Sequence, residues 1–165
     1  MKKAVLFWAL FASCFSVLQA QKLQALQEVL SLVPETPVLT ASSTGAIPLK
    51  SLVADKLPVA HFEKGKLAAM AMSPATVIET DVQSLSGIKA ANTQLQQAEL
   101  LRITLKSAAD LGRKPDFSGI SSLAGLKYVL VLAEFNTTPG QLERWLGSAI
   151  TSSNLQWLYT VSIPQ

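Results

Sequence analysis

Three apolar segments in the second half of the chain start at regular intervals, at positions 100, 128 and 156. They are rich in β-branched and aromatic residues, as strands are, and run over Leu100 to Lys106, Tyr128 to Phe135 and Gln156 to Ile163. Because side chains alternate across a strand, a constant spacing puts equivalent residues on one face of a sheet. That face would carry three rows: Leu101, Val129 and Trp157; Ile103, Val131 and Tyr159; Leu105, Ala133 and Val161. The spacing therefore predicts three aligned strands.

The stretches between these segments are long enough for crossovers and have helical signals. Thr138 followed by Pro139 predicts a capped helix start. Residues 76–82 are predicted as a leading strand, and apolar spacing over 84–97 predicts a helix before the first apolar segment. Crossovers of this kind join parallel strands. We therefore predict an α/β fold: a small, mostly parallel sheet of repeated strand-helix units of about 28 residues, with an N-terminal helix and an extended arm.

One segment resembles the strand region of leucine-rich-repeat proteins. It is Ser-Ser-Leu-Ala-Gly-Leu-Lys-Tyr-Val-Leu-Val, which contains Leu123, Leu126, Val129 and Val131. The turn asparagine of that family is replaced in the three units by Lys106, Glu134 and Ile163. This departure favours a compact α/β sheet with repeat-like units over a horseshoe. The chain also resembles small exported bacterial proteins of unassigned function, and that resemblance implies no activity.

Residues 1–20 have the pattern of a signal peptide. Lys2 and Lys3 precede an apolar run from Ala4 to Leu18, and the small residue Ala20 stands directly before the predicted cleavage site. The run is shorter than the roughly 20 residues that a membrane-spanning helix needs. We therefore predict cleavage after Ala20, a secreted or periplasmic protein, and no membrane span.

The only cysteine, Cys14, allows an alternative. Phe11-Ala12-Ser13-Cys14 resembles a bacterial lipobox, in which the cysteine carries lipid and anchors the protein to a membrane surface. Cleavage after Ala20 instead removes Cys14 and leaves a mature chain that cannot form an internal disulfide.

Charge argues against nucleic acid as a partner. Without Lys2 and Lys3, 12 basic residues face 11 acidic ones, a formal charge of 12 − 11 = +1. The basic residues are scattered singly rather than clustered, unlike those of a nucleic-acid-binding face.

The remaining chain divides into three parts. Residues 21–33 have the apolar spacing of a short amphipathic helix. Residues 34–74 contain five prolines and are predicted as an extended arm or linker, with strand-like segments laid over the core as the alternative. Residues 75–165 form the predicted α/β domain.

Few residues point to chemistry. His61 is the only histidine, so no metal site and no cofactor are expected.

Glu79 and Asp81 would share a face of the leading strand and could act as an acid-base pair, or be solvated. Ser86-Gly87-Ile88-Lys89 fits a Ser-x-x-Lys pattern, but chance alone accounts for one such match. A small secreted hydrolase using a serine or Glu79 and Asp81 is the enzymatic alternative.

The second face of the predicted sheet is a candidate binding surface. Arg102, Tyr128, Leu130 and Leu158 have the composition of an interface if the face is open. If helices cover it, the leucines belong to the core. We predict a non-enzymatic binding or structural accessory protein of the bacterial envelope or secreted fraction, with a protein or an envelope component as partner.

Overall fold

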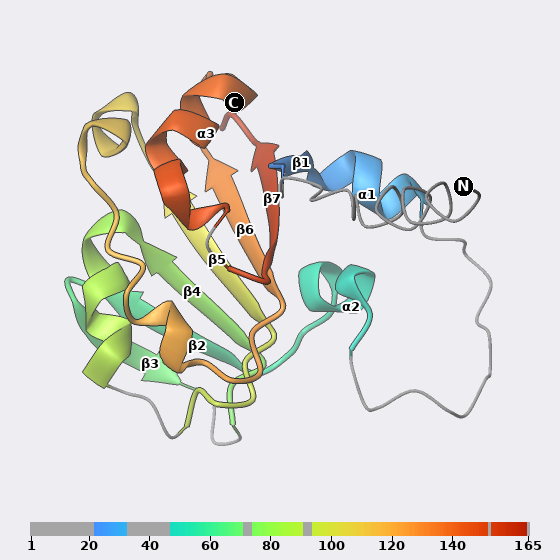
Figure 1. The fold of residues 1–165 in the computed structure, drawn as a ribbon. Coiled ribbons are helices and arrows are strands. Elements are labelled where there is room, and N and C mark those ends of the chain that lie inside the picture. The colour runs from blue at the N-terminus through green and yellow to red at the C-terminus, as the bar shows by residue number, and fades with distance from the viewer. Residues whose placement is uncertain (1–21, 33–46, 71–73, 91–93, 152, 165) are drawn as a thin grey trace, which may run out of the picture.

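A computed structural model of the chain describes residues 22–32, 47–70, 74–90, 94–151 and 153–164. Within them, seven strands form one sheet in the order β1-β7-β6-β5-β4-β2-β3 (Figure 1). The strands are β1 (Gln24–Ala25), β2 (Val59–Glu63), β3 (Lys66–Met70), β4 (Val77–Asp81), β5 (Leu100–Leu105), β6 (Tyr128–Ala133) and β7 (Gln156–Val161). All neighbours are parallel except β2 and β3. The protein is therefore an α/β protein with a mostly parallel sheet.

The pairing of β5, β6 and β7 follows the regular spacing of the three apolar segments. Leu101 is the Cα partner of Val129, which in turn is the partner of Trp157. This is the alignment that the sequence predicts. The shared face is largely buried, and only Val161, at the end of β7, is among the exposed large apolar residues.

One layer of helices packs on this face (Figure 1). It consists of α3 (Pro139–Leu146) and the 3₁₀ segments η1 (Val82–Ala90), η2 (Ala108–Gly112), η3 (Ile120–Ser122) and η4 (Gly147–Ala149). The predicted cap of α3 is confirmed, because the Gln141 N–H donates to the Thr138 hydroxyl and Pro139 lies in the first turn. The helix buries Leu142, Trp145 and Leu146 against the sheet.

The segment predicted as a helix over 84–97 differs from that prediction. Residues 82–90 form the 3₁₀ segment η1, and residues 91–93 lie outside the described residues. Val82, Leu85 and Ile88 are spaced by three, and all three are buried. A 3₁₀ helix has three residues per turn, so this spacing aligns the three side chains toward the sheet.

The prediction of an extended arm over 34–74 is wrong for its described part. Residues 47–70 contain α2 (Leu49–Ala54) and the hairpin of β2 and β3. Lys64 and Gly65, which connect the two strands, both have positive φ, as a two-residue hairpin turn of type I′ requires. Ala60 and Phe62 are buried on the helix-covered face, and this burial anchors β2 in the sheet.

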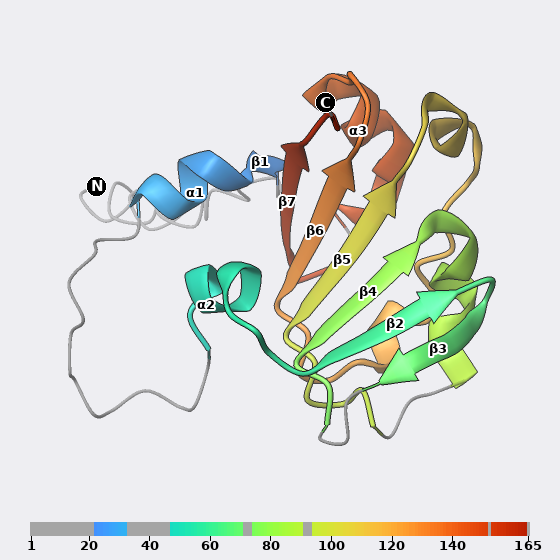
Figure 2. The same ribbon diagram turned by 180° about the vertical axis from the view of Figure 1, so that it is seen from behind.

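The opposite face of the sheet has a smaller helical cover. The helix α1 (Leu26–Leu32) and α2 lie on the side away from α3 (Figures 1 and 2). Their buried leucines form a second core with strand residues near the amino ends: Leu26, Leu49, Leu52, Val77, Leu100, Leu130 and Leu158. Within the described residues, no helix has the length and apolar character to cross a membrane.

Candidate functional site

The carboxyl halves of the strands leave part of the second face open. In Figure 2 no helix is drawn in front of the ends of β4, β5 and β6. A row of polar side chains marks the border of this open half, because His61, Glu79 and Arg102 are neighbours across β2, β4 and β5. The same row continues into Leu130 and Leu158, which lie under the helices.

Glu79 is the centre of an ion network in this row. Its Oε2 lies 3.0 Å from Nδ1 of His61, and its Oε1 accepts a hydrogen bond from Nη1 of Arg102 at 2.5 Å. Glu79 and Arg102 are partly buried, with 29% and 24% of their side chains exposed, whereas His61 is exposed, at 47%. Nη2 of Arg102 also donates to the Val53 carbonyl at 3.5 Å, which links the network to α2.

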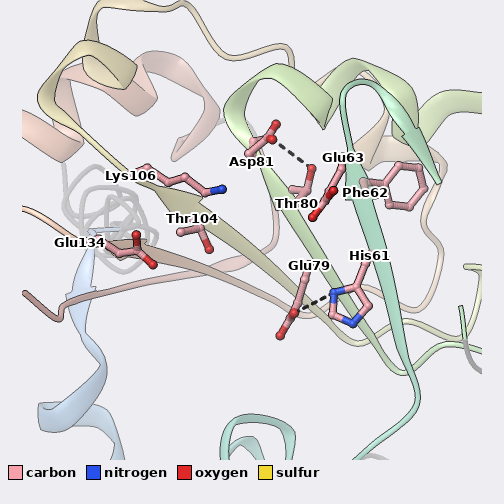
Figure 3. Close-up of a pocket in the computed structure, with 9 residues that line it drawn as sticks. All are labelled: His61, Phe62, Glu63, Glu79, Thr80, Asp81, Thr104, Lys106 and Glu134. Atoms are coloured by element: carbon pink, nitrogen blue, oxygen red, sulfur yellow. Dashed lines mark hydrogen bonds and ion pairs between the residues drawn. The ribbon is translucent and has the colours of Figure 1, made fainter. Parts of the chain in front are cut away.

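A cavity of about 220 Å³, which we call the polar groove, lies beside this network (Figure 3). Asp81 ends β4 and Glu63 ends β2, while Lys106 and Glu134 directly follow β5 and β6. The complete lining is His61, Phe62, Glu63, Glu79, Thr80, Asp81, Thr104, Lys106 and Glu134. The polar groove thus lies at the carboxyl ends of parallel strands, where open α/β sheets bind their ligands.

The polar groove carries an excess of negative charge. Four carboxylates and one ammonium group line it, a formal charge of −3 with His61 neutral. Arg102, which does not line the groove but pairs with Glu79, lowers this excess to −2. In Figure 3, Lys106 lies between Glu134 and Asp81. A ligand with positive charge therefore complements the groove better than an anion does.

Glu79 and Asp81 both line the groove, but each has a structural partner. Oδ1 of Asp81 accepts the Ser84 N–H at 2.8 Å and so caps the start of η1. Glu79 is paired with His61 and Arg102, as described above. Among the described residues, no hydrogen bond joins Nε2 of His61 to a hydroxyl. Nor does this part of the chain place three His, Cys, Asp or Glu side chains where they could hold a metal ion.

The four residues predicted as a binding surface are not exposed together. Leu130 is 2% exposed and Leu158 0% exposed, both in the second core under α1 and α2. Their proposed role in a surface is therefore corrected to a role in the core, because two helices cover the amino half of this face. Tyr128 is partly buried against the same core, and only Arg102 reaches the open half.

No protein-family model, no curated protein and no solved structure matches this chain. The chemistry of the polar groove is therefore the ground for a functional proposal.

Several groove residues were not predicted from sequence, above all Glu63, Lys106 and Glu134. A signal for two of them exists, because Lys106 and Glu134 occupy equivalent positions in successive units and each follows a predicted strand. Such positions gather at one edge of a parallel sheet. No comparable signal placed His61 beside Glu79, since the pairing of β2 with β4 was not predicted.

Proposed function

We propose that the protein is an exported, non-enzymatic binding protein whose polar groove takes a small ligand with positively charged amino groups. The observation that carries this proposal is the excess of carboxylates around a groove at the carboxyl ends of parallel strands. An amine-bearing component of the envelope fits this chemistry.

The side-chain network supports binding over hydrolysis. Hydrolysis by a His61–Glu79 pair would require a nucleophile or a held water at Nε2 of His61. In the described residues the carboxylates of Glu79 and Asp81 are instead engaged with Arg102, His61 and a backbone N–H. Such fixed charges suit a preformed recognition site, because little ordering is needed when the ligand arrives.

Replacing Glu134 with glutamine tests the groove. We expect 1,5-diaminopentane to bind the purified chain in calorimetric titrations, and Glu134→Gln to weaken binding about fivefold, since one charge-charge contact at a partly exposed site is lost. Added salt should weaken binding further.

Two controls make this test specific. Glu143→Gln changes a carboxylate on α3, outside the groove, and should bind the diamine as the unchanged chain does. The uncharged 1,5-pentanediol should not bind. Equal affinity for diol and diamine, or an unchanged affinity of Glu134→Gln, would show that charge in this groove does not recognise the ligand.

The proposal includes export through residues 1–20, which lie outside the described residues. We expect a chain produced with its leader in a bacterial host to begin at Gln21, because the small residue Ala20 before that position suits signal cleavage. Intact-mass spectrometry of the exported protein measures this. A lipid-modified Cys14 at the N-terminus would establish the anchored alternative, and an intact Met1 would contradict export by cleavage.

We also propose that the strand and crossover units between positions 98 and 163 are structural repeats, preceded by an N-terminal helix. A fixed period with one strand in each unit is the sequence pattern of repeat architectures. The register of β5, β6 and β7 supports this proposal, as does the resemblance of the segment around Leu126 to leucine-rich-repeat strands.

A further inference from the structure

A larger cavity, of about 470 Å³, lies on the other face of the sheet, among the helical segments next to β7. We call it the aromatic cavity. Its lining consists of Phe117, Ile120, Ser121, Leu123, Ala149, Ser153, Asn154, Leu155 and Trp157. Its volume falls in the range of about 300–1,000 Å³ typical of small-molecule sites.

Two aromatic rings form one wall of this cavity. Phe117 and Trp157 meet edge to face, with centroids 5.3 Å apart and an interplanar angle of 81°. The indole Nε1 of Trp157 donates to Oγ of Ser153 at 3.1 Å. The polar atom of the indole is thus already hydrogen-bonded, and Trp157 is only 2% exposed. The partly buried ring of Phe117, supported by the indole, therefore offers the larger aromatic surface to a ligand.

The polar part of the lining consists of Ser121, Ser153 and Asn154 and is uncharged. No side chain of the cavity carries a charge near pH 7. Oγ of Ser121 donates to the Ser118 carbonyl and Oγ of Ser153 to the Ala149 carbonyl, so both hydroxyl protons are used. Asn154 is exposed and differs from these two serines, because within the described residues its carboxamide has no hydrogen-bond partner. One amide is therefore available beside an apolar, aromatic cavity.

We propose that the aromatic cavity binds a neutral, planar aromatic molecule whose hydroxyl or carbonyl group reaches the Asn154 carboxamide. The absence of charge in the lining disfavours an ionised ligand, which would lose hydration without gaining a partner. An apolar cavity with one orienting polar group is the usual composition of such sites. The site lies across the sheet from the polar groove and does not depend on the function proposed for the groove.

The indole resonances of the protein provide a direct test with 1-naphthol, which is neutral near pH 7. Trp157 lines the cavity, whereas Trp145 does not and donates its Nε1–H to the Arg113 carbonyl. In ¹H–¹⁵N NMR titrations we expect a saturable shift of the Trp157 indole signal, clearly larger than that of Trp145. The anionic 1-naphthalenesulfonate has the same rings and should produce at least tenfold weaker binding.

Substitutions at exposed positions test the location without disturbing the core. Ser121→Phe adds a ring at an exposed lining position and should weaken 1-naphthol binding at least tenfold. Ala109→Phe adds the same ring on η2, outside the cavity, and should leave binding unchanged. Asn154→Ala should weaken binding about three- to tenfold through loss of one hydrogen bond.

One further variant distinguishes ligand binding in the aromatic cavity from ligand binding in the polar groove. Glu134→Gln should leave 1-naphthol binding unchanged, whether or not the groove binds amines. The proposal is overturned if Trp157 does not shift up to the solubility limit of 1-naphthol, if Ser121→Phe binds like the unchanged chain, or if the sulfonate binds equally well.

Discussion

Leu130→Ala is expected to lower the free energy of unfolding by about 2–5 kcal/mol. Leu130 is 2% exposed and belongs to the second core with Leu52 of α2 and Leu158 of β7. Truncation removes apolar contacts and leaves a cavity between the sheet and the helices, which relax only in part. Urea denaturation followed by circular dichroism measures the loss.

Leu132→Ala is the matched control for this effect. Leu132 lies two residues further along β6 and points to the same face, but it is only partly buried and lies outside the second core. We expect a clearly smaller loss of stability. Equal and small losses at both positions would mean that α1 and α2 do not cover this face, and Leu130 would again be a candidate for a binding surface.

Gly87→Ala is expected to destabilise the protein by about 1–3 kcal/mol, because an added methyl group overlaps with backbone. A Cβ at Gly87 would lie 2.2 Å from the carbonyl oxygen of Gly65, in the turn between β2 and β3. The Gly65 N–H also donates to Oγ of the buried Ser84, at 2.9 Å, so η1 and the hairpin turn are joined there. Relief of the overlap requires movement of the hairpin.

Gly112→Ala provides the comparison. A Cβ at Gly112 has nothing within 4 Å and the residue lies at the end of η2, so this variant should be as stable as the unchanged chain or slightly more stable. Thermal unfolding of both variants distinguishes a specific contact from a general cost of replacing glycine. If the Gly87→Ala variant had the same melting temperature as the unchanged chain, this would contradict the close packing of the hairpin and η1. Close packing explains this glycine within Ser86-Gly87-Ile88-Lys89 without any catalytic role.

Local patterns were enough to predict the central strands and the start of α3. The alternation of apolar residues and the constant spacing between the three segments specify which residues of β5, β6 and β7 share a face. The Thr138 and Pro139 pair specifies where the helix starts. In η1, by contrast, a spacing of three residues is compatible with either helix type over so short a segment, so the pattern predicted a helix without specifying that it is a 3₁₀ helix.

The hairpin and the groove depended on contacts between distant parts of the chain. The prolines between 34 and 74 favoured an arm, although the turn at Lys64 and Gly65 needs only two residues. The juxtaposition of His61, Glu79 and Arg102 arises because β2 pairs with β4, which in turn pairs with β5. None of these pairings is visible in the spacing of residues along a single strand.

The sequence by itself determined that the protein is an α/β protein, which strands align, and that Glu79 and Asp81 share a face. The periodicity of side chains is a local property, so it can be recognised without knowing the fold. Only the tertiary structure decided which half of the second face is open. That choice depends on where α1 and α2 bury their leucines: they cover Leu130 and Leu158 and leave the carboxylates at the strand ends outside the second core. The alternation of side chains along a strand does not specify whether the amino half or the carboxyl half of this face is covered by helices. Burial of apolar surface under α1 and α2 covers the amino half, and the candidate site therefore lies on the carboxyl half.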